Sequence, residues 1–317
     1  AFVKAQTAQG TVIRRLATDG GINHEDGSPV EWHDSVMLNW RDGRVVTAYI
    51  KLIQELAAMG IEGLRVDVAH NWGTMLPTNP SLKSRVKLFG QITSWQRAAN
   101  GGFKVVSQWN NQEANPLLLK IVNDITKIHP AFIFIGENYG RYEQLIKSGV
   151  IPMDSGIHDE LVKVIKDKQS VRGILNGHAR WKLGSLPEGS QVVAALETHD
   201  YERAMDRWKS VGPWALKSAL WAMLSMNRGP VMIFDRQEEG EVHRIRIDNP
   251  SEHNYAEADQ QRYYAQLDFQ KQHGETVQDF YARALAYFRK HEVLREGGNY
   301  VLDTQHNRVF AMVRYDK

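Results

Sequence analysis

Gly63-Leu64-Arg65-Val66-Asp67-Val68-Ala69-His70, residues 63–70, is the stretch of sequence that decides the fold. It is an apolar, strand-like run that carries an arginine and an aspartate and ends on a histidine. Alternate side chains of a strand share a face, so Arg65 and Asp67 are predicted to point toward one site. An adjacent guanidinium favours the ionised carboxylate that a nucleophile requires, and a structural ion pair at a strand end has the same sequence pattern.

Two further apolar runs end in acidic residues. Residues 131–136 lead directly to Glu137, and residues 191–196 lead to Glu197-Thr198-His199-Asp200. Short, nearly continuous apolar runs of this kind are typical of strands buried on both faces of a parallel sheet. The intervals from Asp67 to Glu137 and from Glu137 to Asp200 each leave room for two strand–helix units. Acids at the carboxyl ends of several strands therefore predict an α/β fold of the (β/α)8 TIM-barrel type.

At this point the residues resemble a known family. GLRVDVAH, FIGEN and ETHD, in this order and at this spacing, are similar to signature regions of the α-amylase superfamily, glycoside hydrolase family 13. The likeness covers roughly residues 30–317. It implies a retaining α-glycosidase that hydrolyses α-1,4-glucans through a covalent glycosyl-aspartate. In that mechanism Asp67 is the nucleophile, Glu137 the general acid/base and Asp200 the acid that stabilises the transition state.

The predicted substrate-binding residues lie beside these acids or just past a strand end, and they are Arg65, His70, Trp72, Tyr139, His199 and Tyr201. The resemblance implies that Arg65 orients the nucleophile and that His199 binds the sugar in the cleavage subsite. His70 matches a position that often contacts substrate in the family, with an ordinary hydrogen-bonded loop histidine as the alternative. The three aromatic residues are placed to stack on glucose rings, with core packing or loop anchoring as the alternative.

Five strands are predicted, around residues 61–67, 131–136, 149–155, 191–196 and 229–234, and the resemblance makes them strands four to eight of the barrel. Helical periodicity predicts helices over 45–57, 214–226 and 280–289, the first of them stopped by Gly60. A literal match to the family's first region, Asp19-Gly20-Gly21-Ile22-Asn23-His24, follows a segment with two adjacent arginines where a buried strand would be apolar. We therefore assign it to a loop.

The predicted domains are a remnant of an inserted domain or loop over 1–40, an incomplete catalytic barrel over 41–297, and the start of a C-terminal β-domain over 298–317. The first three barrel strands are not identifiable. An open five-stranded barrel would expose two long unpaired edges, which native proteins avoid. We therefore expect the chain to be part of a longer polypeptide.

Composition narrows the class of partner. The net charge is +2 over 317 residues, and no apolar run approaches the length that spans a bilayer. We expect an α-glucan or maltooligosaccharide substrate and neither a nucleic-acid nor a membrane partner. The chemistry requires no cofactor. Many family members hold a structural calcium ion, but the motifs identify no ligands for one here.

Several features leave alternatives open. Thr198 stands where the family usually has asparagine, and we interpret it as subfamily variation because threonine still accepts a hydrogen bond. Arg203 is predicted to pair with an acid, and the acidic loop over 235–241 is predicted to be solvated. The motifs do not separate hydrolysis from transglycosylation. A non-catalytic glucan-binding relative, or an enzyme acting on sucrose, trehalose or an α-1,6 branch, remains an alternative.

Overall fold

The computed structural model of the chain describes residues 2–7, 10–15, 18–22, 29–32, 42–67, 69, 94–97, 103–106, 114–138, 141–208, 211–212, 214–243 and 255–316. It divides into two compact units. Unit 1 comprises residues 1–137 and 141–150, and unit 2 comprises residues 138–140 and 151–317.

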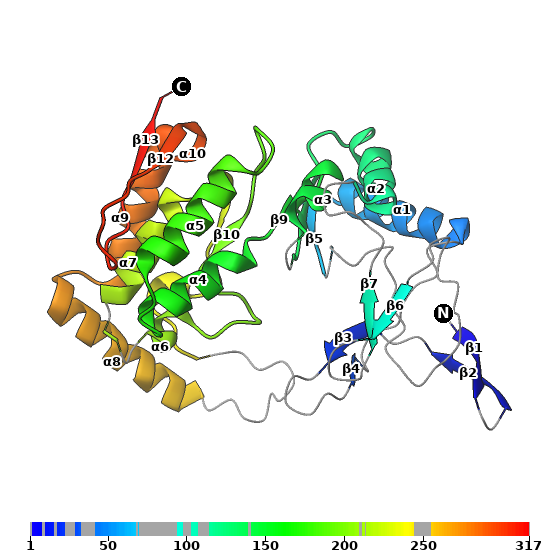
Figure 1. Cartoon of the computed structure of the whole chain (residues 1–317), viewed down its shortest axis with the longest axis horizontal. Helices are drawn as coiled ribbons and strands as arrows, with labels where there is room; N and C mark the ends of the chain where they lie inside the picture. The colour runs from blue at the N-terminus through cyan, green and yellow to red at the C-terminus, as the bar shows by residue number, and fades with distance from the viewer. Residues whose placement is uncertain are drawn as a thin grey trace. The chain divides into compact units, whose positions relative to one another are not determined.

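Unit 1 is built on a parallel pair of strands. β5 (Gly63–Val66) pairs with β8 (Ile133–Gly136), and the register places Val66 opposite Gly136. α1 (Gly43–Ala58), α2 (Pro116–Thr126) and α3 (Tyr142–Lys147) accompany this pair, and α1 and α2 contact each other (Figure 1). The core comprises Ile53, Val66, Ala69, Leu118, Ile121, Val122, Ile125, Phe132, Phe134, Leu145 and Val150.

The helices of unit 1 begin and end at residues suited to those positions. The Asp42 carboxylate accepts a 3.0 Å hydrogen bond from the Arg44 backbone N–H at the start of α1. The Asn115 side chain accepts from the first turn of α2, which opens on a proline. Such caps satisfy backbone donors that have no partner inside the helix. Gly60, with φ of 93°, follows α1 in the left-handed conformation, which confirms the predicted stop.

Three antiparallel pairs precede or interrupt this arrangement: β1 (Phe2–Thr7) with β2 (Gly10–Arg15), β3 (Thr18–Ile22) with β4 (Pro29–Trp32), and β6 (Ser94–Arg97) with β7 (Phe103–Val106). Asp19 lies in β3, opposite Glu31 of β4. The prediction of a loop for the match to the family's first region is therefore wrong for residues 19–22, which belong to an antiparallel strand pair, whereas barrel strands are parallel. The end of that match, His24, lies outside the described residues.

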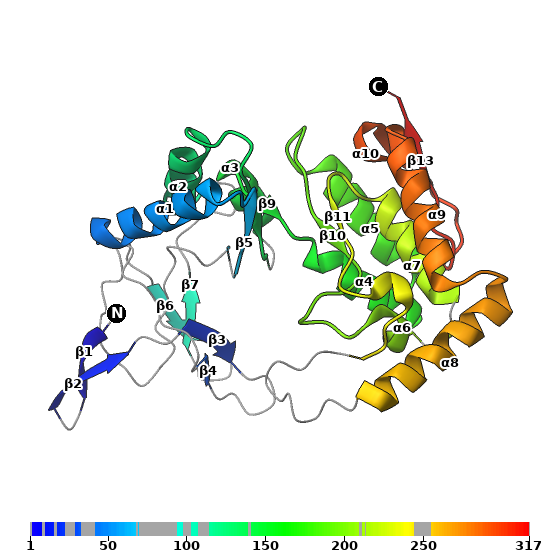
Figure 2. The same cartoon turned by 180° about the vertical axis from the view of Figure 1, so that it is seen from behind.

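Unit 2 contains a second parallel pair. β10 (Ala194–Ala195) pairs with β11 (Val231–Met232), and the two lie side by side in Figure 2. Met153, just after β9 (Ile151–Pro152), forms a parallel bridge with Val193. At the end of the chain, β12 (Gly298–Val301) and β13 (Met312–Tyr315) pair antiparallel. The helices of unit 2 are α4 (Ser155–Ile165), α5 (Val171–Gly184), α6 (Ala204–Arg207), α7 (Trp214–Ser225), α8 (Tyr255–His273), α9 (Val277–Lys290) and α10 (Val293–Glu296).

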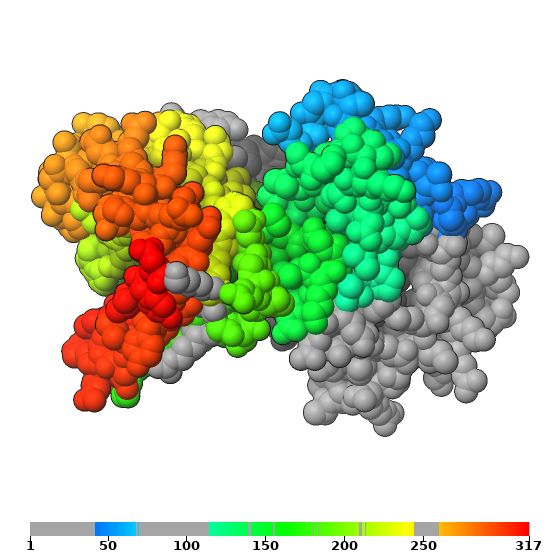
Figure 3. Space-filling view, turned by 90° about the horizontal axis from the view of Figure 1, so that it is seen from above, coloured from blue at the N-terminus to red at the C-terminus, as the bar shows by residue number. Residues whose placement is uncertain are grey.

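α7 is the central helix of unit 2. It contacts β10, α4, α8 and α9, and seven of its twelve residues are buried. A helix that is apolar on most of its faces requires neighbours on several sides, and these four elements are its neighbours. α8 and α9 adjoin each other on the surface of the unit (Figure 3). The strands therefore have helices packed against them, as an α/β protein requires.

The α/β class is confirmed by the two parallel strand pairs, and each predicted strand and helix has an observed counterpart. The observed strands are shorter than the apolar runs that predicted them. Among the described residues the strands form separate small sheets rather than a closed barrel. The domain boundaries near residues 40 and 297 stay predictions. No helix in the described part of the chain combines the length and apolar character needed to cross a membrane.

A buried charge network stabilises the start of α4. The Asp154 carboxylate is fully buried and accepts from the Ile157 N–H, which caps the helix. Its Oδ2 lies 2.7 Å from Lys182 Nζ and 3.2 Å from His178 Nε2. Although burial alone would raise it, the pKa of Asp154 is held far below its usual range by the Lys182 ammonium and by His178. Each charge in this network therefore depends on its partner.

We expect Lys182→Met to destabilise the protein by about 3–5 kcal/mol, because it leaves a buried carboxylate without its main counter-charge. Urea unfolding at pH 7 measures this. Lys120→Met is the matched control, since Lys120 forms an exposed pair with Asp124 on α2 and should change stability by less than about 1 kcal/mol. The double variant Asp154→Asn/Lys182→Met should recover much of the loss. A Lys182→Met loss no larger than the control's would contradict the network's role.

Candidate active site

Arg65 brings two of the predicted catalytic acids together in unit 1. Asp67 follows β5 and Glu137 follows β8. Arg65 Nη1 donates to Asp67 Oδ1, and Arg65 Nη2 lies 3.1 Å from Glu137 Oε1. One guanidinium therefore binds both carboxylates through adjacent nitrogens. The prediction that Arg65 and Asp67 share a face is confirmed, and the contact with Glu137 adds the third group.

The two acids differ in accessibility. The Asp67 side chain is 73% exposed, whereas that of Glu137 is 11% exposed. The Glu137 N–H continues the strand ladder by donating to the Val66 carbonyl, 2.9 Å away. A Cβ added at Gly136 would lie 2.9 Å from Ala69 Cβ and 2.8 Å from Val150 Cγ1. Gly136 is therefore required for this close packing, which fixes the backbone that presents Glu137.

In unit 2 a loop after β10 carries the third predicted acid. His199 and Asp200 are 40% and 45% exposed, and His199 Nε2 lies 3.3 Å from Asp200 Oδ2. The Thr198 hydroxyl accepts a 3.1 Å hydrogen bond from the Asp200 N–H. The prediction that threonine still accepts a hydrogen bond here is confirmed. We call residues 198–202 the Asp200 loop.

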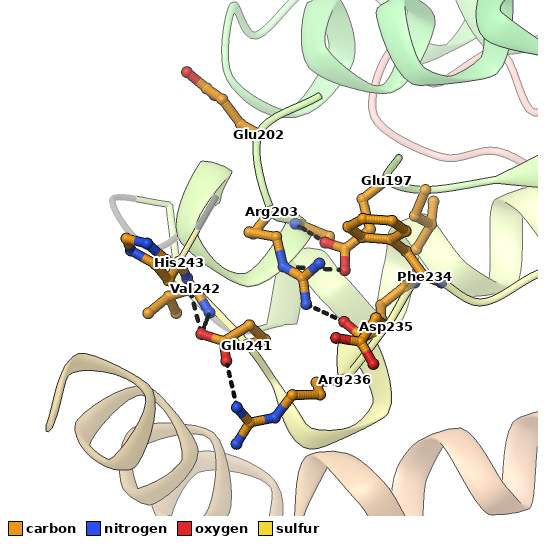
Figure 4. A network of polar contacts seen from close by, with 12 residues as sticks. Glu197, Glu202, Arg203, Phe234, Asp235, Arg236, Glu241, Val242 and His243 are labelled. Carbon is orange, nitrogen blue, oxygen red and sulfur yellow. Dashed lines mark hydrogen bonds and ion pairs between the residues drawn. The ribbon is translucent and has the colours of Figure 1, made fainter. Parts of the chain in front are cut away.

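The two ends of the Asp200 loop are joined by buried polar groups. Glu197 Oε2 accepts from the Ala204 N–H, and Glu197 Oε1 lies 3.5 Å from Arg203 Nε (Figure 4). Arg207 of α6 donates to the Leu196 carbonyl at 3.3 Å and also to the Glu202 carbonyl. Glu197 and Arg203 are 1% and 2% exposed. The predicted pairing of Arg203 with an acid is confirmed, and the acid is Glu197.

A second ion network holds the loop after β11. Glu241 Oε2 lies 3.2 Å from Arg262 Nη1 and 3.6 Å from Arg236 Nη1, while its Oε1 accepts from the N–H groups of Val242 and His243 (Figure 4). Arg236 also pairs with Glu239 at 3.1 Å. Gln237 and Glu241 are buried. The prediction of a solvated loop over 235–241 is therefore wrong for these two residues, whereas Asp235 is exposed and the Glu239 side chain is 42% exposed.

Burial controls the charge of Glu197. Removal from water raises the pKa of Glu197 to about 7, and the nearby Glu241 adds to the rise. The Arg203 guanidinium, the Ala204 N–H and the Arg207 guanidinium oppose it. A carboxyl group that titrates near neutral pH therefore joins the ends of the Asp200 loop.

Of the three predicted aromatic residues, Tyr201 is the one that the structure describes, and its role stays a prediction. Tyr201 lies in the Asp200 loop and stacks on His158 of α4, with ring centroids 3.9 Å apart and planes 16° from parallel. One face of Tyr201 is thus covered by His158, a residue that the sequence analysis did not single out. His70, Trp72 and Tyr139 lie outside the described residues, and their roles stay predictions.

Asp154 was not predicted from the sequence, although a signal was present. Asp154 follows the apolar stretch at β9 just as Glu137 follows β8. The partners that reveal its role, His178 and Lys182, lie on α5, and no local pattern connects them to it. Arg207 was missed for the same reason. Its acceptors are backbone carbonyls, which a sequence does not mark.

The cavity near the start of β10 and β11 does not belong to the candidate site. It has a volume of about 850 Å³ and is lined by Ser190 and Gln191 before β10 and by Arg228 and Gly229 before β11. It therefore lies at the amino-terminal ends of the strands, whereas barrel enzymes place their catalytic groups at the carboxyl ends. Within the described residues, no group of three or more histidine, aspartate or glutamate side chains could hold a metal ion.

Comparison with solved structures identifies the fold. The chain is similar to the α-amylase from H. orenii, with a TM-score of 0.63 and 15% identity over 95% of this chain and 62% of that one. It is similar to the Nostoc punctiforme debranching enzyme, with a TM-score of 0.62 and 14% identity over 95% of this chain and 56% of that one. It is also similar to the cyclic α-maltosyl-(1→6)-maltose hydrolase from Arthrobacter globiformis, with a TM-score of 0.55 and 12% identity over 95% and 58%.

These comparisons establish a shared fold. The chain spans 56–62% of the length of these three proteins. No protein-family model matches the chain, and no curated protein matches it. The fold therefore agrees with the family that the motifs resemble. The comparisons do not establish the activity of this chain.

Glu197 predicts a pH dependence of stability. Because its pKa rises from about 4.5 to about 7 on folding, the folded state binds the proton more tightly between these values. The contribution of Glu197 to stability should therefore be fully present below pH 4.5 and should fall by up to about 3 kcal/mol as pH rises through 7. Urea unfolding of wild type and Glu197→Gln between pH 4.5 and 8 measures the difference. Identical pH slopes for the two proteins would contradict the shift.

Proposed function

We propose that the chain is the catalytic part of a retaining α-glycosidase that hydrolyses α-1,4-glucans. The observation that carries the proposal is the pairing of Asp67 and Glu137 on one guanidinium, at the carboxyl ends of neighbouring parallel strands, in a chain with the fold of α-amylases. Retaining glycosidases need two carboxyl groups about 5–5.5 Å apart, and two carboxylates held by one arginine are close neighbours.

The proposed mechanism assigns one role to each acid. Asp67 attacks the anomeric carbon while Glu137 donates a proton to the leaving oxygen, which gives a covalent glycosyl-Asp67 intermediate. Glu137 then accepts a proton from water as the water attacks that intermediate. The greater exposure of Asp67 suits a group that must reach a carbon of the substrate, and Glu137 is the less exposed of the two acids.

The transition state carries positive charge on the sugar ring, and we assign its stabilisation to Asp200, with His199 as a sugar ligand. Both residues follow β10, at the same type of strand end as Asp67 and Glu137. A closed (β/α)8 barrel would bring all these strand ends to one face. Our proposal therefore includes a closed barrel in which the three acids lie on one face. The chemistry needs no cofactor.

Two alternatives concern the acceptor and the linkage. A sugar hydroxyl in place of water would make the enzyme a glucan transglycosylase. A preference for α-1,6 linkages is supported by the likeness to a debranching enzyme and to a maltosyl-(1→6)-maltose hydrolase. A non-catalytic glucan-binding protein is disfavoured, because the three acids, Arg65 and His199 are all present.

We expect maltoheptaose to be converted to shorter oligosaccharides only, as separated by chromatography of the products. Asp67→Asn should lower turnover about a thousandfold or more while the fold stays intact, because the amide cannot form the glycosyl ester. Products longer than seven units would indicate transglycosylation. An Asp67→Asn variant with more than about a tenth of the wild-type rate would remove Asp67 from the nucleophile role.

The covalent intermediate has its own test. With α-maltosyl fluoride, the C–F bond breaks as the Asp67–carbon bond forms, and fluoride leaves with the electron pair without needing a proton. Glu137→Gln lacks the base for the second step, so the maltosyl-enzyme should accumulate and appear as an added maltosyl mass on the peptide that contains Asp67. The matched control Asp67→Asn/Glu137→Gln should gain no mass. Equal labelling of the two variants would contradict the mechanism.

A further inference from the structure

The Asp200 loop is exposed where it would act and buried where it is anchored. Asp200 and His199 are accessible, whereas Glu197 and Arg203, at the two ends of the loop, are almost completely buried. Side chains at the ends thus fix the direction in which Asp200 projects. A group that stabilises a transition state must be held in place before the reaction, because a displacement of about 1 Å can cost about a hundredfold in rate.

Arg203 connects this loop to the next one. Its Nε pairs with Glu197, its Nη2 donates to the backbone carbonyl of Asp235, and its guanidinium lies 4.9 Å from the centre of the Phe234 ring (Figure 4). Phe234 and Asp235 follow β11, the parallel neighbour of β10. One side chain therefore joins the segments at the carboxyl ends of both strands.

Arg207 holds the same loop in a different way. Its acceptors, the carbonyls of Leu196 and Glu202, both belong to the segment that begins at the end of β10. These bonds draw the two ends of the loop together. The bond from Arg203 to Asp235 attaches the closed loop to the segment after β11, which the ion network of Glu241 holds in turn.

We propose that Arg203 is a positioning residue, which fixes the Asp200 loop against the segment after β11 and so sets the place of Asp200 in the reaction. The inference rests on the proposed function of Asp200. A planar guanidinium is the group that can pair with a carboxylate, donate to a carbonyl and cover an aromatic ring at once. A lysine ammonium at the same position keeps the charge but is a single point donor.

The test compares Arg203→Met, Arg203→Lys and a control in the full chain. In Arg203→Met the kcat on maltoheptaose should fall about a hundredfold with KM nearly unchanged, because the loop is displaced while other sugar contacts stay. Arg203→Lys should fall between Arg203→Met and wild type. Hydrogen exchange of the backbone amides of residues 198–202 should be faster in Arg203→Met than in wild type.

Leu175→Ala is the control for a general loss of stability, since Leu175 is a buried apolar residue on α5. Variants are compared at temperatures equally far below their Tm. The control should leave kcat and the exchange of the Asp200 loop near wild-type values. The proposal is overturned if Arg203→Met and Leu175→Ala lower kcat equally, if the loop exchanges faster without loss of kcat, or if kcat falls without faster exchange.

This design separates failure of the inference from failure of the proposed function. If wild type turns over no glucan, the proposed function fails, and the exchange measurement still decides whether Arg203 holds the loop. If wild type is active and the exchange of the loop in Arg203→Met is unchanged, the proposed function stands and the positioning role fails.

Discussion

Parallel pairing of neighbouring strands is the constraint on which both parts of the candidate site depend. Parallel strands end at the same edge, so the residues that follow β5 and β8 are neighbours, as are those that follow β10 and β11. In each pair one arginine spans the two strand ends. Arg65 binds Asp67 and Glu137 in unit 1, and Arg203 binds Glu197 and the Asp235 carbonyl in unit 2. The arginine supplies the positive charge and the several donors that converging acids and carbonyls require.

Two buried acids of unit 2 show that burial alone does not decide the charge of a carboxyl group. Removal from water would raise the pKa of both Asp154 and Glu197. For Asp154 the Lys182 ammonium at 2.7 Å and His178 outweigh this effect, so its pKa lies below the usual range. For Glu197 the Arg203 guanidinium is 3.5 Å away, and the pKa rises to about 7. A close, hydrogen-bonded cation makes the difference. Asp154 is therefore a fixed anchor for α4, whereas Glu197 can change charge near neutral pH.

The sequence predicted what local patterns determine. Apolar runs located the strands, helical periodicity located α1, Gly60 located its end, and the strand alternation of Arg65 and Asp67 predicted that they point toward one site. It did not predict interactions between groups far apart in the chain. The burial of Glu241 in the loop after β11 was not predicted, because Arg262, which neutralises it, is 21 residues away. The strands are also shorter than their apolar runs, because burial makes a segment apolar whether or not it continues the hydrogen-bonded ladder.

The low identity to solved structures follows from how little the site demands of the sequence. Chains that are 12–15% identical share this fold with TM-scores up to 0.63. The demands visible here are apolar strands that pair in parallel, an acid just past each strand end, a glycine where the packing admits no Cβ, and an arginine that spans neighbouring ends. Most other positions need only to be apolar and of suitable volume. A few motifs can therefore stay recognisable in a chain that no family model matches, since those motifs are where the fold and the proposed chemistry depend on the same residues.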